Sequence, residues 1–250
     1  TKKMKAVTAE HMEDEIQENA YAETMQMADA FNQLKARLKN LDESRQEFVS
    51  NVSHELKTPL TSMKVLADSL IQMPDAPVEF YREFMEDISA EIDRENTIIA
   101  DLLTMVKLDK TQAEMNIQAH NINELLELIL KRLKPIASKQ NVEMVLESFR
   151  EVVAEVDEVK LTLALTNFVE NAIKYNKENG WVHVSLDADH KFFYVKVTDS
   201  GCGIPEEDQE HIFERFYRVD KSHSREIGGT GLGLAIAKNI VLMHKGIIEI

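Results

Sequence analysis

Residues 48–60 read FVSNVSHELKTPL, a helical stretch that carries a histidine beside a carboxylate and ends near a proline. Its apolar residues recur at helical spacing, at Phe48, Val52, Leu56 and Leu60. On such a helix His54 and Thr58 are one turn apart and Glu55 is adjacent, so the three can border one exposed patch. Pro59 removes a helical hydrogen bond, which predicts a local bend. A single histidine on a helix is, taken alone, more often a solvated surface residue.

The segment before this helix has the apolar spacing of a coiled coil. The spacing alternates between four and three residues at Met27, Phe31, Leu34, Leu38 and Leu41. It continues through Arg45, a poor residue for such a seam, to Phe48 and Val52. This pattern predicts pairing with a second helix, and a single amphipathic helix packed on its own domain is the alternative.

A second long helix completes the helical half of the chain. The first helix resumes after Pro59 and meets a break at residues 73–78, where two prolines lie three residues apart. An amphipathic helix is then predicted over residues 79–110. Two such helices form a hairpin with an uncovered apolar face. Two chains are therefore expected to pair as a four-helix bundle.

Composition excludes several classes of protein. The net charge of −15 argues against nucleic acid or an anionic membrane as the partner. Cys202 is the only cysteine, which rules out internal disulfides and cysteine-cluster metal sites and fits a reducing compartment. No apolar run has the length of a membrane span and the start lacks a signal-peptide pattern, so the chain itself is expected to be soluble.

The second half of the chain has a mixed pattern after a polar linker. Helices are predicted over residues 122–140, 158–176 and about 230–244. The predicted strands are a pair over 142–146 and 152–156, a hairpin over 182–186 and 192–198, and a strand that begins near the end of the chain. Helices with a mainly antiparallel sheet predict an α+β layer sandwich.

One predicted helix has a polar face suited to phosphate and metal. Asn167, Asn171 and Lys174 lie at i, i+4 and i+7, which places them on one face. A carboxamide oxygen can ligate Mg²⁺, and a lysine can neutralise phosphate charge. For this helix taken alone, an ordinary solvated face is the simpler interpretation.

Two glycine-containing segments suggest a nucleotide. Residues 199–205 read DSGCGIP directly after a predicted strand. An acid at this position can accept a hydrogen bond from an exocyclic amine such as that of adenine. A simple turn is the alternative interpretation. Residues 228–234 read GGTGLGL and open a helix, where backbone amides form an anion site. This spacing differs from the Walker and Rossmann patterns. Between the two, FERFYR at residues 213–218 begins a segment predicted to be a lid, or else its aromatics cap the core.

Together these segments resemble the catalytic region of the bacterial two-component sensor histidine kinases. The five family motifs appear in order over residues 44–250: SHELKTPL, NFVENAIKYN, DSGCGIP, IFERFYR and GGTGLGLAIAK. Residues 22–41, with ADAFNQL, resemble less closely the last helix of a HAMP linker. The resemblance implies a homodimeric protein-histidine kinase that uses ATP and Mg²⁺ to phosphorylate His54 and passes the phosphate to an aspartate of a response regulator receiver domain.

The resemblance also implies a domain order and a fold class. The fold is multidomain, α and α+β: a dimeric four-helix bundle of helical hairpins, then an α/β-sandwich Bergerat (GHKL-type) ATP-binding domain. The expected parts are a HAMP-like signalling helix (1–43), a dimerisation and histidine phosphotransfer hairpin (44–112), a linker (113–120) and the ATP-binding domain (121–250). The family's closing strand hairpin does not follow Ile250, so truncation of that domain is expected. The chain would be the cytoplasmic part of a plasma-membrane sensor.

Residue roles in the phosphoacceptor helix follow from the same resemblance. Glu55 would accept the proton of the His54 imidazole and make its nitrogen a better nucleophile. Thr58 would orient a water that dephosphorylates the regulator. Arg218 resembles the lid arginine that approaches the γ-phosphate.

The nucleotide-binding roles are carried over by position. On the polar helix, Asn171 would ligate Mg²⁺, Asn167 would support the metal–phosphate end, Lys174 would contact phosphate and Tyr175 would lie against the nucleotide. Asp199 would accept from the adenine amine, and Gly201 and Gly203 would admit the base. The phosphate loop comprises Gly229, Thr230, Gly231, Leu232 and Gly233, and its glycines would hinge the lid.

The sequence departs from the family pattern at two further places, and other functions remain as alternatives. Asn176 replaces a common threonine or serine, and residues 244–246 read HKG in place of the frequent HGG. An ATPase of the chaperone, gyrase or mismatch-repair type shares the nucleotide fold but lacks the His-Glu hairpin. A catalytically silent dimeric scaffold would have lost motif residues that are present here. A regulator phosphatase as main output stays open, because Glu55 and Thr58 allow both activities.

Overall fold

The computed structural model describes residues 22–73, 77–110, 115–219 and 229–250. The chain divides into two compact units, residues 1–64 and 65–250, which are described separately below. The expected HAMP-like segment lies in part at residues 1–21, outside the described residues. Within the described parts, no helix contains a stretch long and apolar enough to cross a bilayer.

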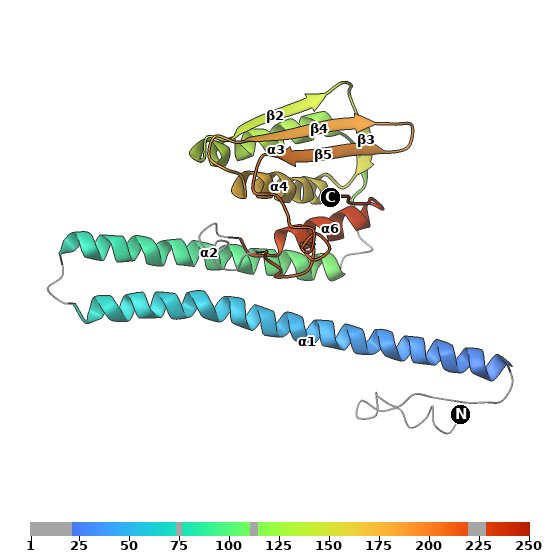
Figure 1. The fold of residues 1–250 in the computed structure, drawn as a ribbon, viewed down its shortest axis with the longest axis horizontal. Helices are drawn as coiled ribbons and strands as arrows, with labels where there is room; N and C mark the ends of the chain where they lie inside the picture. Colours follow the sequence, from blue (N-terminus) through green and yellow to red (C-terminus); the bar gives the residue numbers. More distant parts are fainter. Residues whose placement is uncertain (1–21, 74–76, 111–114, 220–228) are drawn as a thin grey trace. The chain divides into compact units, whose positions relative to one another are not determined.

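The first unit consists of most of a single helix, α1 (Ala22–Ile71), which continues through Pro59 (Figure 1). The predicted coiled-coil seam is exposed at Met27, Leu34 and Leu38, whose side chains are 61%, 54% and 48% accessible. Apolar residues at coiled-coil spacing that remain this open within their own chain suit a partner helix. The pairing itself stays a prediction.

Helix α2 (Val78–Lys110) confirms the second predicted helix. At its start the hydroxyl of Tyr81 donates to the carbonyl of Met73 at 2.6 Å, a bond that closes the turn between α1 and α2. Three side chains one or two turns apart on α2 are almost fully buried: Ile98, Met105 and Leu108. This buried stripe defines the inner face of α2.

The remainder of the chain contains two small sheets. Strands β1 (Gln118–Asn121) and β3 (Val153–Val156) form an antiparallel pair. Strands β2 (Glu143–Ser148), β4 (Trp181–Ala188) and β5 (Phe193–Asp199) form a sheet in the order β2-β4-β5. The β4–β5 hairpin is antiparallel, as predicted, whereas β2 runs parallel to β4.

Three sequence-based expectations about strands are wrong. The strands near 142–146 and 152–156 do not pair with each other, since β2 pairs with β4 and β3 pairs with β1. Strand β1 was not predicted and occupies the end of the segment expected as linker. A strand was expected to begin near the end of the chain, but residues 246–250 form none. A strand needs a hydrogen-bonded partner strand, and among the described residues neither sheet includes this segment.

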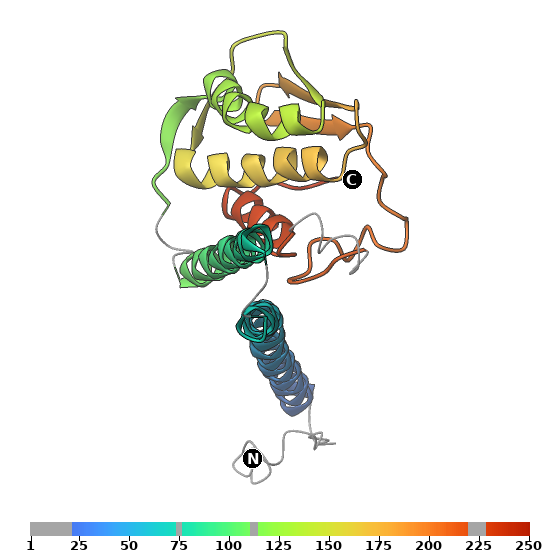
Figure 2. The ribbon, with the colours of Figure 1, turned by 90° about the vertical axis from the view of Figure 1, so that its left-hand side faces the viewer.

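Helices α3 (Ile122–Lys139), α4 (Glu158–Lys174) and α6 (Gly233–Met243) lie beside these strands (Figures 1 and 2). Helices α3 and α4 pack on each other and on the three-stranded sheet, and α6 packs on α4. Asn121 caps α3 by accepting from the N–H groups of Asn123 and Glu124, and Asp157 caps α4 by accepting from Lys160.

One apolar core joins α3 and α4 to the sheet. Its fully buried members alternate along β4 and recur at helical spacing on the helices: Ile122, Leu126, Ile129, Val169, Ile173, Val182, Val184 and Leu186. Each such side chain contributes about 1.5–3 kcal/mol on burial. The architecture is therefore a helical hairpin followed by an α/β sandwich, as predicted, and the core fixes α4, whose other face carries the candidate site.

Candidate active site

The predicted polar face of α4 meets the glycine-rich loop. Asn167, Asn171 and Lys174 are half-buried on one side of α4. The side-chain amide of Asn167 donates to the carbonyl of Gly233 at 3.1 Å. The ammonium of Lys174 lies 2.8 Å from Glu170, one turn earlier on the helix. The first of these contacts fixes the start of α6 against the asparagine face of α4.

The DSGCGIP segment folds back against the end of α4. The carboxylate oxygen Oδ1 of Asp199 accepts from the N–H of Gly201 at 2.8 Å, and the N–H of Cys202 reaches the carbonyl of Tyr175 at 3.3 Å. A methyl group at Gly201 would lie 2.3 Å from that same carbonyl oxygen. Only glycine fits there, so the strand end and the helix end are held in contact by the backbone itself.

Tyr175 also reaches the glycine-rich loop. A methyl group at Gly229 would lie 3.0 Å from the Tyr175 hydroxyl. Further along, Gly231 has φ of 70° and its carbonyl accepts from the N–H of Phe216 at 2.8 Å. A methyl group at Gly231 would meet the Phe216 backbone at 2.9 Å. The loop is thus packed between Tyr175 and the segment that was predicted as a lid.

The loop ends in a helix whose first N–H groups receive no side-chain cap. Helix α6 begins at Gly233, and Leu232 at its N-cap position is buried. The hydroxyl of Thr230, itself 9% exposed, accepts from the N–H of Leu232 at 3.2 Å. A helix start without a side-chain cap, preceded by glycines, is typical of an anion-binding site.

Thr230 has a second bond, which the sequence did not predict. Its hydroxyl donates to the Oδ2 atom of Asp101 on α2 at 2.7 Å. The pKa of the Asp101 carboxyl is raised, chiefly because the group is buried. The bond from Thr230 opposes this and lowers the pKa. The charge of Glu170 raises the pKa further, and the charge of Lys174 lowers it. Asp101 therefore lies within electrostatic range of the polar face of α4.

The predicted lid is described only in part. Residues 220–228 lie outside the described residues, and with them the end of the lid and Gly228. Before them, the Tyr217 hydroxyl bonds to Asp208, and the Lys238 ammonium lies 5.3 Å from the centre of the Phe213 ring. Phe216 has φ of 65°, a conformation held by its bond to the loop. Arg218 is half-buried at the end of this described portion.

The predicted phosphoacceptor residues lie in the first unit, on α1. His54 is exposed and Glu55 is half-buried. The hydroxyl of Thr58 donates to the carbonyl of His54 at 3.1 Å, one turn back on the helix. This bond places Thr58 beside His54, as the helical spacing predicted.

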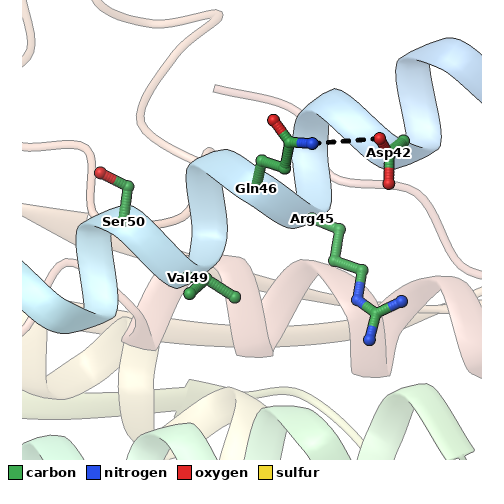
Figure 3. A pocket seen from close by; sticks show the side chains of 5 residues that line it. All are labelled: Asp42, Arg45, Gln46, Val49 and Ser50. Atoms are coloured by element: carbon green, nitrogen blue, oxygen red, sulfur yellow. Dashed lines mark hydrogen bonds between the residues drawn. The ribbon is translucent and has the colours of Figure 1, made fainter. Parts of the chain in front are cut away.

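A surface hollow lies on α1, N-terminal to His54 (Figure 3). It is lined by side chains from this one helix: Asp42, Arg45, Gln46, Val49 and Ser50. The amide of Gln46 donates to Asp42 at 3.1 Å within it. Arg45, a member of the predicted seam, and Val49 face the same side of α1, so the hollow is part of a helix face rather than a ligand site.

Several residues with structural roles at the site were missed by sequence reasoning. Asn176 is one: its side-chain amide bonds to the carbonyls of Ala172 and Trp181, and its oxygen accepts from Ser200. Asn176 therefore connects the end of α4 to Trp181 and Ser200, at a position where the resembled family commonly has threonine or serine. Asp101, Glu170 and Phe216 are the others: Asp101 lies outside the motifs, while Glu170 and Phe216 lie inside them but were given no role.

Two family models match the chain. The first is the His Kinase A (phospho-acceptor) domain over residues 44–111. The second is the Histidine kinase-, DNA gyrase B-, and HSP90-like ATPase over residues 156–250. They cover the helical hairpin and most of the α/β sandwich, in that order.

Curated relatives are sensor kinases. Sensor histidine kinase WalK of Bacillus subtilis is 39% identical over 209 residues, which cover 82% of this chain and 34% of WalK. Sensor-like histidine kinase SenX3 of Mycobacterium tuberculosis is 35% identical over 210 residues, covering 84% of this chain and 51% of SenX3. The chain thus spans about a third to a half of the length of these relatives.

Solved structures agree at the level of the fold. The structure of histidine kinase ThkA in complex with response regulator protein TrrA has a TM-score of 0.63 at 24% identity, covering 84% of this chain and 60% of that one. Acinetobacter baumannii histidine kinase AdeS has a TM-score of 0.61 at 22% identity, covering 76% and 86%. Because the two family models match in this order and the relatives named above are sensor kinases, the chain belongs to the two-component sensor histidine kinases.

Proposed function

We propose that the chain phosphorylates its own His54 from ATP and passes the phosphate to an aspartate of a response regulator. The observation that carries this proposal is the junction of three motifs at Tyr175 and Asn167. Tyr175 contacts Gly201 through its carbonyl and Gly229 through its hydroxyl, and Asn167 bonds to Gly233. Segments far apart in the sequence thereby meet at α4, and between them they carry an acid, two carboxamides, a lysine and a glycine loop.

The base end of the nucleotide would lie at Asp199. Its Oδ1 atom is occupied by the N–H of Gly201, so Oδ2 is the oxygen that would accept from the adenine amine. The close approach of Gly201 to Tyr175 leaves the backbone, rather than a side chain, at the wall of the site. A flat base fits against such a wall better than a bulky ligand would.

The phosphate end would lie between α4 and the start of α6. The carboxamide oxygen of Asn171 fits Mg²⁺, which takes few protein ligands and completes its shell with phosphate oxygens and water. The N–H groups at the start of α6 and the Lys174 ammonium would neutralise phosphate charge. When bound, Mg²⁺ would supply further charge neutralisation at the β- and γ-phosphates.

The transfer itself needs an accessible nucleophile. His54 is exposed, so its ring nitrogen is accessible for attack on the γ-phosphorus of a bound nucleotide. A nitrogen–phosphorus bond forms while the bond from the γ-phosphorus to the bridging oxygen of ADP breaks, and Glu55 takes the proton from the other ring nitrogen. Positioning and charge neutralisation would account for most of the rate, with Arg218 acting near the γ-phosphate.

A second activity, dephosphorylation of the regulator, is favoured by the geometry of Thr58. Its hydroxyl hydrogen is committed to the His54 carbonyl, which leaves oxygen lone pairs that can accept from a water. Such a water, held one turn from His54, would attack the phospho-aspartate of a docked regulator. The same surface of α1 would then serve both transfer and its reversal.

The exposed seam of α1 supports a homodimer through the hairpin, and the regulator would dock on that bundle. Since the relatives are named as sensor kinases, we further propose that this chain is the cytoplasmic part of a plasma-membrane sensor. The acidic charge of −15 gives no support to a nucleic-acid partner.

The proposal is tested by Asn171→Ala with Asn96→Ala as the matched control. Asn96 is an exposed asparagine on α2, so its truncation removes the same atoms away from the site. Binding of a non-hydrolysable ATP analogue is measured with and without Mg²⁺. Asn171→Ala should lose the Mg²⁺-dependent part of the affinity and Asn96→Ala should keep it; unchanged Mg²⁺-dependent affinity in Asn171→Ala would contradict the assigned site.

A further inference from the structure

Helix α2 inserts a carboxylate into the phosphate end of the candidate nucleotide site. Asp101 lies on the same face of α2 as Ile98, Met105 and Leu108, all buried, and is the polar member of that stripe. Helix α2 packs on α6, the helix that the glycine-rich loop opens. The contact is therefore part of a packed surface rather than an isolated side chain that reaches across solvent.

The bond between Asp101 and Thr230 uses up a donor that a phosphate would need. A threonine hydroxyl has a single hydrogen. In this structure that hydrogen is donated to Asp101 at 2.7 Å, while the hydroxyl oxygen accepts from Leu232. Thr230 cannot donate to a phosphate oxygen while it donates to Asp101.

The charge of Asp101 needs an explanation beyond stability. The carboxylate lies in range of Glu170, a like charge, and burial disfavours its ionised form. A neutral asparagine would accept from Thr230 without either penalty. What the carboxylate adds is a negative charge in the space where the Lys174 ammonium and the loop would otherwise meet phosphate.

We propose that Asp101 is an internal competitor of the nucleotide's phosphates, which holds the glycine-rich loop against α2 until ATP displaces it. This inference rests on the proposed function, because it assigns a regulator to the same site. Two anions cannot share the donors of one loop at low cost, so α2 docking and phosphate binding exclude each other. By reciprocity, any change in the hairpin that withdraws Asp101 raises the affinity for ATP, and ATP in turn releases α2.

The test compares four versions of the 250-residue chain: the wild type, Asp101→Asn, Asp101→Glu and Asp93→Asn. Asp101→Asn keeps an acceptor for Thr230 and removes the charge. Asp101→Glu keeps the charge. Asp93→Asn removes the same charge from an exposed position of the same helix and is the matched control. The affinities for a non-hydrolysable ATP analogue with Mg²⁺ and for adenosine are measured by calorimetry, and thermal unfolding verifies that each variant is folded.

The inference expects Asp101→Asn to bind the ATP analogue more tightly by about 5-fold to 150-fold, the usual range for coupled sites. Asp101→Glu and Asp93→Asn should bind it like the wild type, and adenosine should bind all four proteins alike. If Asp101→Asn fails to fold, Asp101→Ser carries the same expectation.

Two results would overturn the inference alone. One is equal affinity of Asp101→Asn and Asp93→Asn for the analogue. The other is an equal gain for adenosine, which would place the effect away from the phosphates. Absence of analogue binding in every protein, the wild type included, would overturn the proposed function and this inference together.

Discussion

The predicted phosphoacceptor helix and the candidate nucleotide site are built in opposite ways. On α1, His54 is exposed, and the hydroxyl of Thr58 donates to a carbonyl one turn back on the same helix. At the nucleotide site, residues from α4, β5 and the glycine loop hold one another, as Gly201 does with Tyr175. Substitutions on α1 should therefore change activity without changing stability, whereas substitutions at the candidate nucleotide site should change both.

The largest effect is expected at His54. His54→Ala should abolish phosphoryl labelling from γ-labelled ATP, while ATP binding and unfolding stability stay within about 0.5 kcal/mol of the wild type, as for exposed substitutions generally. The control is His190→Ala, which removes an exposed imidazole from the β4–β5 turn and should leave labelling intact. Undiminished labelling of His54→Ala would assign the phosphate to another residue.

A glycine pair tests the other side of the comparison. Gly201→Ala places a methyl group 2.3 Å from the Tyr175 carbonyl, and we expect a loss of about 3 kcal/mol because backbone atoms cannot move aside easily. In Gly203→Ala the added methyl group would meet no atom within 4 Å. The backbone there has φ of 72°, and an alanine in that conformation should lose about 1 kcal/mol of stability.

The measurement for this pair is urea unfolding followed by the fluorescence of Trp181, the one tryptophan, in β4. Gly201→Ala should also lose nucleotide binding. Equal stability of the two variants would show that the junction with Tyr175 is looser than described.

The buried carboxylate of Asp157 caps α4, the helix that carries the candidate site. Burial raises the pKa of Asp157, but the bonds from the Lys160 side chain and from the N–H groups of Lys160 and Asn116 outweigh it, so the pKa is lowered. Asp157→Asn should therefore cost about 2 kcal/mol at pH 7. Because the folded pKa is depressed, the difference from the wild type is full above about pH 4 and disappears as the pH falls through the folded value.

The Asp157 prediction is checked by unfolding both proteins in urea at pH 7 and at successively lower pH. Asp93→Asn, on the exposed side of α2, is the control and should show no such trend. A difference that stays constant down to pH 2 would mean that the lost interactions are not those of the charged form.

The smallest effect on stability is expected at Thr58. Thr58→Ala removes an exposed bond to the His54 carbonyl and should change stability by less than about 0.5 kcal/mol. Autophosphorylation should be spared, and dephosphorylation of the regulator should be impaired. Equal loss of both activities would instead indicate a packing defect around His54.

The sequence predicted the parts of the fold that local periodicity determines. The α4 helix, the β4–β5 hairpin and the start of α6 were all expected from spacing and turn residues, and the structure contains them. The pairing of β2 with β4 and of β3 with β1 was not, because strand partners far apart in sequence leave no local pattern. A four-residue strand such as β1 is too short for periodicity to mark.

The same division holds at the site. Asn167, Tyr175 and the glycines were assigned from motifs, and the structure places Asn167 against Gly233 and Tyr175 against Gly201 and Gly229. Asp101 was missed because its partner, Thr230, is 129 residues away, and an acid on an amphipathic helix looks like any solvated residue. Long-range contacts of this kind require the fold before they can be inferred.

The most direct test of the central claim is the chemical nature of the label. The protein is incubated with γ-labelled ATP and Mg²⁺, and the labelled chain is treated with acid and with alkali. A phosphoramidate on His54 predicts a label that is lost in acid, survives alkali and is absent from His54→Ala. A label that survives acid would be an ester on a hydroxyl residue and would contradict the assignment of His54 as the phosphoacceptor.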